Sequence, residues 1–178
     1  LFIDGGAFHS QAELERKLYV MRRLIEKSVP ECYICSMSGR SIVDKGLLLA
    51  TQLEKFYPDL GDERFKSPLA LVHQRYSTNT FPTWSLAQPF RLLAHNGEIN
   101  TIRGNRAWMD ARESVLESPA LDNIGDIRPI IQPGMSDSAS LDNVLEFLVM
   151  SGLSLPHAMA ILVPESFNEK NPISEDLK

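Results

Sequence analysis

Helix-type and strand-type stretches follow one another along this chain without strict alternation. An amphipathic helix is predicted over 11–28, where apolar side chains recur at helical spacing and Ser10 and Glu13 have the spacing of a capping box. Short β-prone runs follow at 32–37 and 41–45, and the turn composition between them predicts a hairpin. Because a doubly wound parallel sheet needs regular strand–helix alternation, this pattern favours an α+β fold.

The rest of the chain is expected to contain further helices and strands. The helices are predicted over 47–57, 99–116 and 141–150, and the strands over 69–77 and 91–95. A side-chain cap for the last helix is expected from Ser138 or Ser140.

Composition and charge narrow the class of function. The 178 residues have a formal net charge of −5, without any run rich in Lys or Arg. This balance argues against nucleic acid or an anionic membrane surface as the main partner, and no apolar stretch is long enough to span a bilayer. With only two cysteines, a reducing compartment is favoured. The expected location is the cytoplasm, or a plastid if the source is a plant.

The two ends of the chain suggest a segment of a longer protein. It begins at Leu1 without an initiator Met, and it ends in the polar run 168–178. A length near that of one domain predicts a single unit over 1–178. We expect this unit to be an interior, partial domain of a multidomain chain.

The first polar cluster, 73–78, lies at the end of a predicted strand. Arg75 in this position can present its planar guanidinium to a carboxylate through two parallel hydrogen bonds, a geometry that Lys cannot reproduce. The alternative is an Arg in a structural ion pair, which is common and needs no ligand.

The second cluster, 95–98, places the amide side chain of Asn96 beside Gly97, whose backbone can approach a ligand closely. A side-chain NH₂ and a main-chain N–H that converge on one oxygen form an oxyanion hole. An Asn-Gly pair is also typical of a tight turn, because both residues tolerate positive φ.

The third cluster, 134–138, places the carboxylate of Asp137 in a loop before a helix, where it could bind an ammonium group. The alternative is that Asp137 or a neighbouring Ser caps the helix.

The pair Cys32 and Cys35 has C-x-x-C spacing. A structural zinc site normally needs a second pair of ligands, and the four histidines have no His-x₃₋₅-His spacing. Two buried cysteines of a strand are therefore favoured over a metal or redox site.

Together and in this order, the clusters resemble a known family. Residues 73–113 read HQRYSTNTFPTWSLAQPFRLLAHNGEINTIRGNRAWMDARE. This text resembles the glutamine amidotransferase domain of the glutamate synthase large subunit, and weaker similarity covers most of the chain. Class II amidotransferases in general share only short pieces of it, whereas NTFPTW, AQPFR and GEINTIRGN resemble glutamate synthase itself. The implied fold is the four-layer αββα sandwich of amino-terminal nucleophile hydrolases, here incomplete.

The resemblance also implies roles for individual residues. Arg75 would bind the α-carboxylate of L-glutamine, with Thr78 shaping that pocket. Asn96 and Gly97 would form the oxyanion hole. Asp137 would receive the α-ammonium group, and Glu98 lies where some relatives add a second contact to it.

The nucleophile of this family is an amino-terminal Cys, which the chain lacks because position 1 is Leu. Cys32 and Cys35 are internal and have no free amine. We therefore expect the first strands and the catalytic Cys to lie upstream of Leu1, and residues 1–178 alone to be inactive. The resemblance implies a parent enzyme that hydrolyses glutamine and delivers the ammonia to 2-oxoglutarate. FMN and an iron–sulfur cluster are expected in its other domains and no cofactor in this chain. A small electron-transfer subunit or ferredoxin is an expected partner.

Two other functions stay open at this point. One is a glutamine-binding regulatory module that has lost its nucleophile. The other is a glutaminase coupled to a different acceptor, such as amidophosphoribosyl transfer, which the phrases NTFPTW and GEINTIRGN disfavour.

Overall fold

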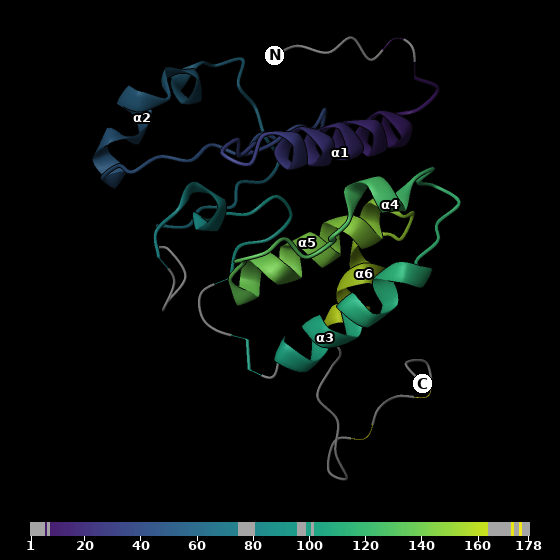
Figure 1. Ribbon diagram of the computed structural model, residues 1–178. Coiled ribbons are helices and arrows are strands. Elements are labelled where there is room, and N and C mark those ends of the chain that lie inside the picture. The colour runs from purple at the N-terminus through teal and green to yellow at the C-terminus, as the bar shows by residue number, and fades with distance from the viewer. Residues whose placement is uncertain are drawn as a thin grey trace.

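The computed structural model describes residues 6, 8–74, 81–95, 99–100, 102–163, 172 and 175. Its α-helices are α1 (Gln11–Ser28), α2 (Leu53–Phe56), α3 (Ile102–Arg112), α4 (Ile124–Ile127), α5 (Asp137–Met150) and α6 (Leu155–Leu162). Short 3₁₀ turns lie at η1 (Ala50–Gln52), η2 (Pro58–Gly61), η3 (Trp84–Leu86) and η4 (Glu113–Val115). Figure 1 shows α1 on one side of α4 and α5, and α3 on the side away from α1.

The predicted first helix is confirmed with the expected bounds. The Ser10 hydroxyl accepts a hydrogen bond from the Glu13 N–H at 3.1 Å, and the Glu13 carboxylate accepts one from the His9 N–H at 2.9 Å. These bonds satisfy N–H groups that have no partner within the helix. The Ser10 cap is a local signal and could be read from the sequence, whereas the Glu13 carboxylate binds the His9 N–H in place of the Ser10 N–H of the predicted capping box.

The main apolar core lies where α1 packs against α4 and α5. Its buried members come from the helices and from the chain before and after α4: Tyr19, Leu121, Ile124, Ile127, Ile130 and Phe147. Burial also raises the pKa of the Tyr19 hydroxyl well above its usual range, with the nearby Glu146 carboxylate acting in the same direction. The packing of α1 against α4 and α5 is therefore stabilised by one continuous apolar core.

A buried charge network joins α1 to α5. The Arg22 guanidinium lies 2.8 Å from Glu26 and 2.5 Å from Glu146, and its side chain is only 2% exposed. Glu26 also pairs with Arg91 at 3.0 Å. Burial alone lowers the pKa of Arg22, but the carboxylates of Glu146 and Glu26 more than offset this effect and raise it. The network thus ties two helices and the loop around 91 together.

The predicted strands are wrong for the part of the chain that the structure describes. Within those residues 32–37, 41–45, 69–74 and 91–95 contain no strand and form no hairpin. The four-layer sandwich is likewise not seen there. A β-prone segment becomes a strand only when a neighbouring strand supplies its ladder of hydrogen bonds.

In several of these segments, side chains supply the backbone hydrogen bonds instead. The Ile34 N–H donates to the Glu26 carboxylate at 3.1 Å, and the Ile34 carbonyl accepts from the Arg91 guanidinium at 2.6 Å. The Val43 N–H donates to the Ser36 hydroxyl at 3.1 Å. The β-propensity of these residues is therefore overridden by local polar contacts.

Three other expected elements differ in their bounds. The helix expected over 47–57 is reduced to η1 and α2, neither of which buries a residue, and short helices without packing are marginal. The helix expected over 99–116 is α3 followed by η4. The helix expected over 141–150 begins earlier, as α5, and α6 was not predicted.

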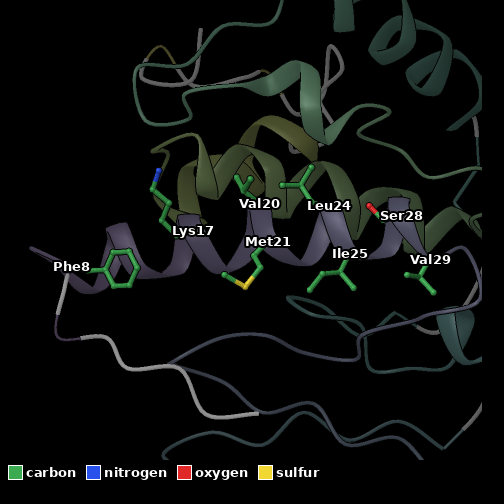
Figure 2. A pocket seen from close by; sticks show the side chains of 8 residues that line it. All are labelled: Phe8, Lys17, Val20, Met21, Leu24, Ile25, Ser28 and Val29. Atoms are coloured by element: carbon green, nitrogen blue, oxygen red, sulfur yellow. The ribbon is translucent and has the colours of Figure 1, made fainter.

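A shallow apolar hollow of about 510 Å³ runs along α1. Figure 2 shows its lining from Phe8 at one end to Val29 at the other, with Met21 and Leu24 between them. No carboxylate or amide side chain lines it, so it offers little for polar recognition. Among the described helices, none combines the length and apolar character needed to cross a membrane.

We predict that Arg22→Met destabilises the contact between α1 and α5 by about 3–5 kcal/mol, because it leaves Glu146 buried without its partner. Hydrogen–deuterium exchange of the intact protein should show faster exchange of the amides in both helices. Arg64→Met is the control, because the Arg64–Asp62 pair is exposed and should change little. Equal effects of the two substitutions would contradict this role.

Candidate functional site

The first turn of α5 carries the one predicted site residue that the structure describes, Asp137. Gly134 has a φ of +76°, in the left-handed region that favours glycine, and turns the chain toward the helix. The Ser136 hydroxyl caps the helix by accepting from the Ala139 N–H at 3.2 Å. The caps expected at Ser138 and Ser140 are therefore wrong, and Asp137 is the first helical residue rather than a loop residue.

The Asp137 carboxylate is held in place from two directions. Its Oδ2 accepts a hydrogen bond from the Ile99 N–H at 3.2 Å, and its Oδ1 lies 3.3 Å from the Arg106 guanidinium. Its side chain is 30% exposed, so solvent or a ligand can still reach it. The N-terminus of α5 also favours negative charge. Asp137 is thus an oriented, accessible carboxylate suited to an ammonium group.

Arg106 reaches from α3 to the start of α5. Its Nε donates to the Ser140 hydroxyl at 3.1 Å, and its Nη2 donates to the Met135 carbonyl at 3.0 Å. With the bond to Asp137, the guanidinium braces the turn that carries the carboxylate. Arg106 was not singled out from the sequence, where it is one of several charged residues in a helical segment.

His95 is hydrogen-bonded through its ring and its backbone. Its Nδ1 lies 3.0 Å from the Ser138 hydroxyl on α5. Its carbonyl accepts from the Gln88 side-chain NH₂ at 2.7 Å, and its N–H donates to the Gln88 side-chain Oε1 at 2.8 Å. The residue that precedes Asn96 in the sequence is therefore fixed in position.

The chain just before His95 is held by Asp142, which is 1% exposed. Its Oδ1 accepts from the N–H groups of Leu92 and Leu93 at 2.8 and 3.2 Å, and its Oδ2 accepts from the Arg91 N–H at 3.3 Å. Burial raises the pKa of this carboxyl to about 6, and Glu146 adds to the effect. The three hydrogen bonds from these backbone N–H groups are charge-assisted when Asp142 is ionised.

Lys45 fixes the chain on the other side of Gln88. Its ammonium donates to the Ala87 carbonyl at 2.6 Å, the Trp84 carbonyl at 3.2 Å and the Tyr33 hydroxyl at 2.8 Å. Burial lowers the pKa of Lys45 to about 8. The segment 84–95 is thus anchored near one end by the half-buried Lys45 and near the other by the buried Asp142.

A polar stripe on α5 unites these contacts. Ser138, Asp142 and Glu146 recur every four residues and so share one face of the helix, and all three are buried. They bind His95, the 91–93 backbone and Arg22 respectively. We missed this stripe in the sequence because its partners are distant along the chain, although three polar residues at i, i+4 and i+8 are a visible signal.

The other predicted site residues lie outside the described residues. They are Arg75, Thr78, Asn96, Gly97 and Glu98. What the structure brings together is Asp137 and Ser138 with Ile99 and His95, the residues on either side of 96–98 in the sequence. His95 of the second cluster and Ser138 of the third, which were predicted separately, therefore meet at the start of α5.

Cys32 and Cys35 carry free thiols, are half-buried and do not lie in a strand, so the prediction of two buried strand cysteines is wrong. Among the residues that the structure describes, no three His, Cys, Asp or Glu side chains are grouped as metal ligands. The C-x-x-C spacing therefore has no metal geometry around it in that part of the chain.

The family model described as glutamine amidotransferases class-II matches residues 1–178. The chain belongs to this family. Class II glutamine amidotransferases have the fold of amino-terminal nucleophile hydrolases, whereas the described part of this member is mostly helical.

Similar proteins include glutamate synthases from three kingdoms of life. The chain is 51% identical over 175 residues to the large chain of glutamate synthase [NADPH] from Azospirillum brasilense, covering 95% of the chain and 12% of that protein. It is 50% identical to the chloroplastic ferredoxin-dependent glutamate synthase of Oryza sativa subsp. japonica, covering 98% of the chain and 11% of that protein. Against glutamate synthase [NADH] of Saccharomyces cerevisiae the identity is 47%, covering 95% and 8%. The chain thus spans about a tenth of the length of these relatives.

We predict that the stability supplied by Asp142 depends on pH. Its pKa is raised from 3.8 to about 6, so its contribution is fully present below about pH 4 and is lost as pH rises through 6. Between pH 4 and pH 7, the free energy of unfolding of the native protein should fall by about 2–3 kcal/mol relative to that of Asp142→Asn. Exchange protection of the amides in 88–95, corrected for intrinsic rates, measures this difference.

Asp122→Asn is the matched control, since Asp122 is an exposed carboxylate paired with Lys17. A stability difference between the native protein and Asp142→Asn that stays constant from pH 4 to pH 7 would refute the assignment.

Proposed function

We propose that this chain is the glutamine-binding part of a glutamate synthase, which hydrolyses L-glutamine to glutamate and ammonia. The observation that carries the proposal is the Asp137 carboxylate, oriented by Ile99 and Arg106 and still accessible at the start of α5. The similarity to three glutamate synthases, at 47–51% identity over at least 95% of the chain, supports it.

In this proposal Asp137 binds the α-ammonium group of glutamine. A hydrogen bond between two charged groups contributes about 1.5–3 kcal/mol. Arg106 occupies one side of the carboxylate and so restricts the directions from which a ligand can approach. Glu98 is proposed to add a second contact to the same ammonium group.

Arg75 is proposed to bind the substrate α-carboxylate through two parallel hydrogen bonds, with Thr78 shaping the pocket. The Asn96 side-chain NH₂ and the Gly97 N–H are proposed to form the oxyanion hole. These assignments rest on the resemblance in 73–113 and on the anchoring of His95 and Ile99, which flank 96–98 in the sequence.

The proposed chemistry is that of an amino-terminal cysteine nucleophile. The thiol proton moves to the cysteine's own α-amino group, and the sulfur attacks the amide carbon of glutamine. The carbon–nitrogen bond breaks, ammonia leaves with the proton from the α-amino group, and a γ-glutamyl thioester remains. Water then hydrolyses the thioester to glutamate and restores the thiol.

The nucleophile is proposed to belong to the full protein outside residues 1–178. Position 1 is Leu, and Cys32 and Cys35 are internal residues without a free α-amino group. A second candidate is a glutamine-binding regulatory module without this nucleophile. Amino-terminal sequencing of the natural mature protein distinguishes the two, because only the enzyme begins with Cys.

The ammonia is proposed to pass to 2-oxoglutarate in another domain, which gives a second glutamate. That step needs electrons, and we propose FMN and an iron–sulfur cluster in the other domains, with ferredoxin or a small electron-transfer subunit as partner. A cytoplasmic or plastid location is proposed on the same grounds, since the rice relative is named as chloroplastic.

We predict that Asp137→Ala and Arg75→Lys in the full protein lower glutamine-dependent glutamate formation on the order of 10²-fold or more, because each removes a charged contact to the substrate. Activity with added ammonium salt should stay close to that of the native protein. Both rates are measured by following 2-oxoglutarate-dependent oxidation of the electron donor.

Asp126→Ala is the control, because the Asp126 side chain is exposed on α4 and its contact to Lys27 uses the backbone carbonyl. An equal loss with both nitrogen sources would show that the substitutions damage the protein as a whole and would sink the assignment.

A further inference from the structure

Gln88 contacts the backbone of His95 as a neighbouring strand would. Its side-chain NH₂ donates to the His95 carbonyl at 2.7 Å, and its side-chain oxygen accepts from the His95 N–H at 2.8 Å. A primary amide has one donor face and one acceptor face, so it can satisfy both groups of one peptide residue at once. Gln88 is 7% exposed, so these bonds are shielded from water.

Gln88 is itself held firmly. Lys45 binds the carbonyl of Ala87, the residue just before it. His95, whose backbone Gln88 binds, is also hydrogen-bonded through its ring to Ser138 at the start of α5. The amide of Gln88 and the hydroxyl of Ser138 therefore fix His95 through different groups.

The next residue along the chain is Asn96, which the proposed function assigns to the oxyanion hole together with Gly97. Donors of an oxyanion hole act only when they are preorganised, and loss of one costs about 10²–10³ in kcat. A displacement of about 1 Å has an effect of similar order. In the proposed function, a change in the orientation of the peptide between His95 and Asn96 would therefore lower kcat.

We propose that Gln88 is a positioning residue, which orients the Asn96–Gly97 donors by clamping the backbone of His95. This inference rests on the proposed function and deepens it. In this proposal Gln88 acts through the His95 backbone, so its effect falls on stabilisation of the tetrahedral intermediate and leaves recognition of the α-ammonium and α-carboxylate groups unchanged.

The amide can be tested by two substitutions in the full protein. Gln88→Leu removes both hydrogen bonds to His95. Gln88→Glu keeps the shape and the acceptor but places a carboxylate oxygen against the His95 carbonyl. When that carboxyl is protonated it can donate again, and burial beside a carbonyl raises its pKa above the ordinary value of about 4.3.

For Gln88→Leu we expect the kcat of glutamine hydrolysis to fall about 10²-fold, with the KM for glutamine changed less than about threefold. Ammonia-dependent glutamate formation should be unchanged. For Gln88→Glu, activity relative to the native protein should rise as pH falls, because the protonated carboxyl restores the donor to His95.

Gln132→Leu is the matched control. Its side-chain amide is half-buried and, like that of Gln88, hydrogen-bonded, but it donates to the Glu26 carboxylate at 3.3 Å, away from His95. This substitution should leave the kcat of glutamine hydrolysis unchanged.

A second readout uses the aldehyde analogue of glutamine, which forms a tetrahedral adduct with a thiol and places an oxygen in the oxyanion hole. Its inhibition constant should rise about 10²-fold in Gln88→Leu, whereas that of the product glutamate should not change. A kcat equal to the native value, or parallel losses in kcat, glutamate affinity and ammonia-dependent activity, would overturn the proposal. Absence of glutamine hydrolysis by the native protein would instead refute the proposed function.

Discussion

The buried guanidinium of Arg22 is the interaction on which the rest of the structure depends. It neutralises Glu26 on its own helix and Glu146 on α5, and Glu26 in turn binds Arg91. Without Arg22, Glu146 would be buried without its ion-pair partner, and a buried charge without a partner costs several kcal/mol. One buried charge network therefore fixes both the packing of α1 on α5 and the position of the loop around 91.

The candidate site depends on this charge network through α5. The same helix face that binds Arg22 through Glu146 binds the 91–93 backbone through Asp142 and the ring of His95 through Ser138. Asp137 begins that helix and is joined to Ile99. The position of the proposed ammonium-binding carboxylate and that of the chain on either side of 96–98 are thus set by one rigid element.

The sequence predicted what is local and missed what is distant. The bounds of α1 follow from a cap and an apolar period within eighteen residues, and they are confirmed. The strands failed because β-prone residues such as Ile34 bond to side chains from elsewhere in the chain. The roles of Gln88, Arg106 and Ser138 depend on partners that spacing cannot reveal. Asp137 was singled out from its local sequence and given its role by the resemblance, whereas its contacts to Ile99 and Arg106 are seen only in the structure.

The choice of polar rather than apolar residues on the inner face of α5 has a physical rationale. An apolar stripe of the same shape would cost less to bury, but apolar contacts tolerate small shifts along the helix axis. Hydrogen bonds weaken steeply with distance and angle. A shift of α5 by one residue would move it 1.5 Å along its axis and rotate the face by 100°, and Ser138, Asp142 and Glu146 would lose their partners together. The polar stripe therefore contributes less to the free energy of unfolding than an apolar stripe would, but it permits only one register of α5. That register fixes the position of Asp137.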